Sequence, residues 1–141
     1  MYTEIQRIYA REIPDSHGNP TVEVVVTLGG GAFGRAAIPS GAITCVHESH
    51  DIRDGDKSRY GGKGLTTIVE HVNNEIAIAI NGMDALDQGA VDRTMLKLDG
   101  TLHKDWLGSN TTMSVSLAVA QAAANSSNLP LFHYLGGACS R

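Results

Sequence analysis

The sequence predicts an α+β fold in which a three-stranded antiparallel β-meander is followed by an α-helical bundle. Apolar residues alternate with polar ones in the first third of the chain, and they recur every three or four positions in the last half. Clusters of turn residues separate these segments. The length of 141 residues matches a single domain, and 42% hydrophobic and 18% charged residues are typical of a globular protein.

The first third contains the predicted strands. Val22–Leu28 alternates with a period of two, and the three glycines that follow favour a tight turn. Ile5–Ile13 and Ala32–Ile38 are also compatible with strands, and the turn-forming segment Asp15–Pro20 separates the first strand from the second. Short connections of this kind join antiparallel neighbours, so we expect a meander.

The second half contains the predicted helices. One apolar stripe over Leu65–Ile80 predicts a first helix that stops at Asn81-Gly82. A second, shorter helix begins after Asp84 or Asp87 and ends at Asp99-Gly100.

A third predicted helix begins near Ser109 or Asn110 and is rich in alanine and serine. Small side chains let helices approach their neighbours closely, so we expect this helix to be central. Leu129-Pro130 breaks it, and Pro130 suits the first position of a last helix, Leu131–Leu135.

The charge of the chain excludes several classes of partner. A net charge of -4 offers no basic surface for nucleic acid or an anionic membrane, so we expect neither partner. No apolar run is long enough for a membrane span, and the N-terminus does not resemble a signal peptide. Cys45 and Cys139 suggest free thiols rather than a disulfide framework. We therefore expect a cytoplasmic protein.

The long stretch Pro39–Gly64 shows neither the strand period of two nor the helical period. Connections of this length are often functional. For three motifs within it we favour a purely structural explanation: polar loop residues, a salt-bridged turn and the start of a helix, in that order. The metal-capable residues Cys45, His47, Glu48, His50 and Asp51 lack zinc-site spacing. Asp51–Asp56 departs from a calcium loop at its third and twelfth positions. Gly61–Gly64 lacks the Ser or Thr of a phosphate-binding loop.

Small residues dominate the start of this stretch, Pro39–Cys45. They suit either a lid that closes over a ligand or a plain connector, and composition alone leaves both open. A nucleophilic Ser40 is disfavoured because the Gly-x-Ser-x-Gly motif is absent.

Several motifs in order along the chain give a family resemblance. They are Ala10–Ile13, Asp15–Val24, Pro39–Ala42, Arg53–Gly64, Gly82–Ala85, Leu98–Thr101, Val115–Ala120 and Leu129–Leu131. Together they resemble the opening of enolase, the glycolytic phosphopyruvate hydratase, a lyase. The resemblance covers essentially the whole chain and implies that residues 1–141 are an enolase N-terminal lid domain without its C-terminal (β/α) barrel.

The resemblance implies that the catalytic groups and the magnesium ligands lie in that barrel. We therefore expect no catalytic residue in this chain, no activity from it alone and no tight binding of magnesium. Proton abstraction beside a carboxylate needs such groups to stabilise the enolate. The implied partners are an enolase barrel domain or subunit, with 2-phosphoglycerate bound only when the barrel is present.

By motif, the lid is the loop Pro39, Ser40, Gly41, Ala42, Ile43, Thr44 and Cys45. Ile43 stands where the family has a serine that ligates magnesium, so the side-chain ligand is lost. Cys45 replaces a glycine, which restricts the loop because cysteine does not readily adopt positive φ. His17 replaces the usual arginine, whereas His47 and Glu48 fit the family.

The resemblance also implies a dimer. Arg11 and Glu23 match positions that pair with charges on the partner's barrel, although each can equally be a solvated strand charge. An alternative function is a stand-alone binding or regulatory module that associates with a full-length enolase or another protein.

Overall fold

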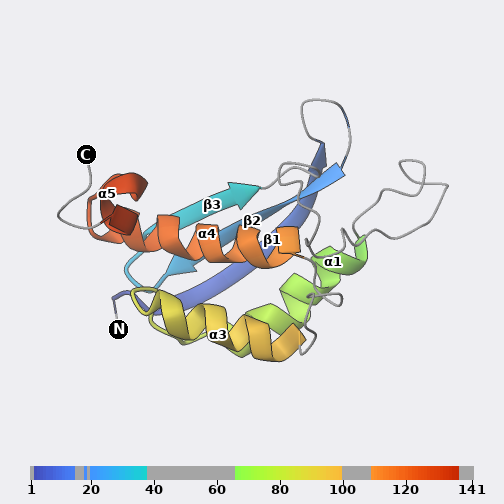
Figure 1. Cartoon of the computed structure of the whole chain (residues 1–141), viewed down its shortest axis with the longest axis horizontal. Coiled ribbons are helices and arrows are strands. Elements are labelled where there is room, and N and C mark those ends of the chain that lie inside the picture. Colours follow the sequence, from blue (N-terminus) through green and yellow to red (C-terminus); the bar gives the residue numbers. More distant parts are fainter. Residues whose placement is uncertain (1, 15–17, 19, 38–65, 100–108, 137–141) are drawn as a thin grey trace.

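The computed structural model describes residues 2–14, 18, 20–37, 66–99 and 109–136. Its sheet consists of three antiparallel strands in the order β1-β2-β3, with helices packed against it (Figure 1). The strands are β1 (Ile5–Pro14), β2 (Pro20–Leu28) and β3 (Phe33–Ala37). The predicted α+β meander is confirmed, and the strand bounds agree with the sequence patterns to within about two residues.

Two register pairs determine which side chains share a face of the sheet. Arg11 on β1 lies opposite Glu23 on β2, and Val25 on β2 lies opposite Arg35 on β3. The turn between β2 and β3 closes with a hydrogen bond from the Leu28 N–H to the Ala32 carbonyl, 2.8 Å long. Gly31 in this turn has a φ of 97°, which explains why the sequence places glycine there.

The helices follow the predicted order. One continuous helix comprises α1 (Thr66–Glu70), the π-helix η2 (His71–Ile76) and α2 (Ala77–Ile80). It is followed by α3 (Gln88–Asp99), α4 (Ser109–Ser126) and α5 (Leu131–Gly136). The π-helix was not predicted, because residues at its ends keep α-helical angles, with φ -63° and ψ -42° at Glu70, and the apolar spacing changes little.

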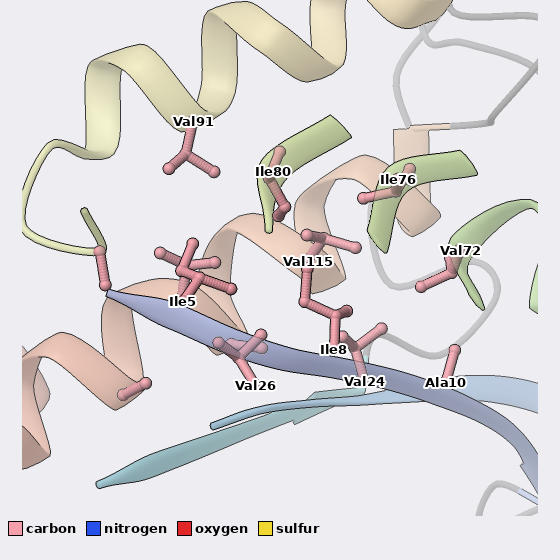
Figure 2. Packing of buried hydrophobic residues seen from close by; sticks show 14 of the residues in the cluster. Ile5, Ile8, Ala10, Val24, Val26, Val72, Ile76, Ile80, Val91 and Val115 are labelled. Carbon is pink, nitrogen blue, oxygen red and sulfur yellow. The ribbon is translucent and has the colours of Figure 1, made fainter. Parts of the chain in front are cut away.

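The hydrophobic core lies between the helices and one face of the sheet. Figure 2 shows Ile5, Ile8, Val24 and Val26 directed from the strands toward side chains of the helices. Helical residues Val72, Ile76, Ile80, Val91 and Val115 complete this core and are fully buried. The apolar side chains that recur with a period of two in β2 therefore pack in one layer with those that follow the helical period in the last half of the chain.

The helix α4 packs against β2, β3, α3 and α5, so it is the central helix. Its small residues permit a close approach to β3 at Gly34. A Cβ atom on Gly34 would meet the Ala118 carbonyl oxygen and the Ala122 nitrogen of the α4 backbone. This contact explains both the glycine in β3 and the alanine-rich character of α4.

The end of α4 is a Schellman motif. Asn128 has a φ of 58°, its N–H donates to the Asn125 carbonyl at 3.2 Å, and the Leu129 N–H donates to the Ala124 carbonyl at 2.9 Å. Leu129-Pro130 then leads into α5, as predicted from the sequence.

Candidate functional site

The face of the sheet opposite the core carries a different set of side chains. A shallow open groove of about 260 Å³ runs across it, and all three strands contribute to its lining. The lining residues are Arg7, Tyr9, Arg11, Glu23, Val25, Thr27 and Arg35. We call this set the outer-face groove. Because successive residues of a strand point to opposite faces, these side chains alternate along the strands with the buried ones.

A charged cluster lies at the centre of the groove. The Arg11 Nε donates to Glu23 Oε1 at 2.8 Å, and the terminal nitrogen Nη2 of Arg11 is also 2.8 Å from that oxygen. The other oxygen, Oε2, lies 4.0 Å from Nε of Arg35. The Glu23 side chain is only 10% exposed, whereas those of Arg11 and Arg35 are 52% and 58% exposed. The two arginines therefore shield a largely buried carboxylate.

Arg7 and Tyr9 occupy the part of the groove next to this cluster. The guanidinium carbon of Arg7 lies 5.8 Å from the centre of the Tyr9 ring, a cation–π distance. None of the described carboxylates forms an ion pair with Arg7. Tyr9 and Phe33 remain 44% and 52% exposed. The outer face thus combines arginine with exposed aromatic rings, a composition that is enriched in protein interfaces.

The outer edge of β1, the strand that carries Arg7 and Arg11, is held by a side chain of the π-helix. Asn73 Oδ1 accepts a hydrogen bond from the Ala10 N–H at 2.8 Å, and Asn73 Nδ2 donates to the Ala10 carbonyl at 3.2 Å. The amide therefore takes the place of a neighbouring strand at this point. It fixes the backbone next to Arg11.

A second junction holds the start of β1 against the loop before α3. Asp84 Oδ1 accepts hydrogen bonds from the Thr3 hydroxyl at 2.7 Å and from the Leu86 N–H at 3.0 Å. The Leu86 N–H first, and the Thr3 hydroxyl second, hold the pKa of Asp84 below its ordinary value. Burial raises the pKa of Tyr134, with a smaller contribution from the charge of Asp84. These contacts are structural.

The structure brings together one pair of predicted site residues, Arg11 and Glu23. The predicted lid, Pro39–Cys45 with Ile43, lies outside the described residues, as do His17, His47 and Glu48. Among the residues that are described, no group of three or more His, Cys, Asp or Glu side chains could hold a metal ion. None of the helices within residues 66–99 and 109–136 has the length and apolar character needed to cross a bilayer.

Arg7, Tyr9 and Arg35 were not predicted as neighbours of Arg11 and Glu23. A signal for the first two was available, because Arg7, Tyr9 and Arg11 recur with a period of two in the predicted first strand. The position of Arg35 could be predicted only from the register of β3 against β2, which the hairpin turn determines.

The fold and this face define the chain as a small α+β domain with a charged, arginine-rich outer face. The family model described as "Enolase, N-terminal domain" matches residues 5–135. The chain belongs to this family.

Two curated relatives support the assignment. The chain is 58% identical over 137 residues to Enolase 2 of Pseudomonas syringae pv. tomato (strain ATCC BAA-871 / DC3000). It is also 58% identical over 137 residues to Enolase 2 of Pseudomonas syringae pv. syringae (strain B728a). Each match covers 97% of this chain and 32% of the relative, so the chain spans about a third of the length of these relatives.

Proposed function

We propose that this chain acts as the N-terminal domain of an enolase, which converts 2-phosphoglycerate to phosphoenolpyruvate in glycolysis. The observation that carries the proposal is the match to the enolase N-terminal domain over residues 5–135, with 58% identity to Enolase 2 over 97% of the chain. In this proposal the catalytic groups belong to the barrel, so the 141-residue chain alone does not turn over 2-phosphoglycerate.

The outer-face groove is, in this proposal, the surface that docks on the barrel of a second enolase subunit. Arg11 and Glu23 form the centre of that surface. Their geometry supports this role, because Arg11 is half exposed and its guanidinium has donors beyond those that contact Glu23 Oε1. A partner that desolvates this cluster strengthens the electrostatic contacts that it makes there.

The loop Pro39–Cys45 is proposed as the lid that covers the substrate. The family uses magnesium to stabilise negative charge on the substrate. The lid of this chain lacks the serine that ligates this ion in the family pattern. The side chain of Ile43 is a hydrocarbon and offers no oxygen to a hard cation. We therefore assign no metal-ligating side chain to position 43. The role of this chain's residues in the reaction is to dock the domain and cover the site.

A chimera tests the proposal. This chain replaces the corresponding N-terminal part of Enolase 2 of Pseudomonas syringae pv. tomato, and phosphoenolpyruvate formation is measured with magnesium present. We expect turnover by the chimera, slower than that of Enolase 2 itself, and faster turnover by the chimera with Ile43→Ser. The isolated chain, measured in parallel, should be inactive.

The matched control is Enolase 2 with isoleucine introduced at the position that corresponds to Ile43, where the family pattern has a serine. This change should slow that enzyme comparably. A folded Ile43→Ser chimera without turnover would contradict the proposal. Turnover by the isolated chain would contradict the proposal that activity requires the barrel.

A further inference from the structure

We infer that Arg7 and Arg35 determine which partner the outer face accepts, and that the matching partner surface carries an excess of carboxylates. This inference rests on the proposed docking function and adds to it a statement of the partner's chemistry. It concerns two residues on either side of the Arg11–Glu23 pair, on β1 and β3.

The groove carries an excess of positive charge. Its lining contains the arginines at positions 7, 11 and 35 and a single carboxylate, Glu23. Three positive charges against one negative charge leave an excess of two positive charges. The whole chain has a net charge of -4, so this face is opposite in sign to the chain as a whole. A local reversal of this kind steers partners of complementary charge.

Glu23 already has an ion-pair partner within the chain, Arg11. Two nitrogens of Arg11 lie 2.8 Å from Oε1, which makes a close, charge-assisted pair. The pair neutralises Arg11 and leaves the excess charge on Arg7 and Arg35. Arg35 only approaches Glu23 Oε2, at 4.0 Å, which is beyond hydrogen-bond distance.

Arg7 and Arg35 are both exposed on the outer face. Arg35 is 58% exposed, and Arg7 is exposed above the Tyr9 ring, without an ion-pair partner among the described carboxylates. Arginine forms paired hydrogen bonds with carboxylates and packs on aromatic rings, so both side chains are suited to an acidic protein surface. A surface rich in Lys or Arg would be repelled.

The experiment uses the chimera described above and measures its subunit dissociation constant by sedimentation velocity at several salt concentrations. The variants are Arg7→Glu, Arg35→Glu and the neutral Arg7→Gln/Arg35→Gln. Arg93→Glu is the matched control, because Arg93 is an exposed arginine on α3 and lies outside the groove lining. Circular dichroism and thermal unfolding establish that each variant is folded.

We expect each Glu variant of the groove to raise the dissociation constant by about tenfold or more, and Arg93→Glu to leave it unchanged. Added salt should raise the subunit dissociation constant of the unmodified chimera more than that of the neutral double variant, because salt screens the attraction between exposed charges.

The outcomes separate this inference from the function on which it rests. A chimera that dimerises and is active, but in which Arg7→Glu and Arg35→Glu behave like Arg93→Glu, would overturn the inference alone. A folded chimera that stays monomeric and has no turnover even with Ile43→Ser would overturn the docking function itself.

Discussion

The two faces of the sheet differ in burial and in the kind of side chain they carry. Neighbouring residues of the central strand β2 show this difference. Val24 and Val26 are fully buried against the helices, whereas Glu23 and Val25 face the outer groove. On the inner face, the choice of side chains is constrained by the volume of the core and by the close approach of α4. On the outer face, charged side chains dominate, and arginines and aromatic rings are exposed. The inner face therefore accounts for stability, and we propose the outer face for partner recognition.

The most severe test of this division is an added methyl group at Gly34. Gly34→Ala places a Cβ atom against the α4 backbone, which cannot move aside as a side chain can. We expect a loss of about 3 kcal/mol or more in the free energy of unfolding, measured by urea denaturation of the chain. Ala37→Val on the exposed side of the same strand is the control and should change stability by less than about 0.5 kcal/mol. Equal losses for both variants would contradict the division.

A pair of valines on β2 compares the faces directly. Val24→Ala removes fully buried methyl groups from the core and should cost about 2 to 3 kcal/mol. Val25→Ala makes the same chemical change on the partly exposed face and should cost less than about 1 kcal/mol. The measurement is again urea denaturation. A larger loss for Val25→Ala would show that the outer face contributes a core of its own.

The edge contact made by Asn73 is expected to have an intermediate effect. Asn73→Ala leaves the Ala10 N–H and carbonyl without the amide and should cost about 1 to 2 kcal/mol. Its neighbour Asn74 is exposed on the same helix, so Asn74→Ala should cost less than about 0.5 kcal/mol. Faster hydrogen exchange at the Ala10 amide in the Asn73 variant alone would confirm the assignment. Identical exchange in both variants would argue against it.

The smallest expected effect is a pH dependence at Asp84. Its pKa is lowered in the folded state, so its contribution to stability is present above the ordinary carboxyl pKa and is lost as pH falls through the folded-state value. Asp84→Asn keeps an oxygen acceptor but does not titrate. The stability difference between the parent chain and this variant should therefore shrink under acidic conditions. A difference that is independent of pH would contradict the proposed hydrogen-bonding role.

Much of the fold follows from the sequence, because its periods report packing directly. The alternation in Val22–Leu28 and the apolar stripe of Leu65–Ile80 each correspond to an observed element. The π-helix did not follow, since a single widened turn barely alters the apolar spacing. The helix break at Leu129-Pro130 was predicted, but the Schellman motif at Asn128 was not, because it depends on a positive φ that asparagine tolerates only in certain contexts.

Less of the candidate site could be predicted, for a different physical reason. Arg11 and Glu23 were found through family resemblance, and the structure places them in contact. Arg35 lies on the same face as Glu23 only because the hairpin fixes the register of β3, and a shift by one residue would turn it inward. The lid Pro39–Cys45 has no period that could fix its conformation, and it lies outside the described residues.

The most direct test of the central claim is to ask whether the outer face becomes covered in an assembled enolase. Hydroxyl-radical footprinting compares the oxidation of Tyr9 and Phe33 in the isolated chain and in the dimeric chimera. Both rings are exposed in the chain, at 44% and 52%. We expect both oxidation rates to fall on assembly and to rise again in the Arg7→Glu and Arg35→Glu chimeras. Oxidation of Tyr9 and Phe33 at the same rate in the isolated chain and in the dimer would contradict it.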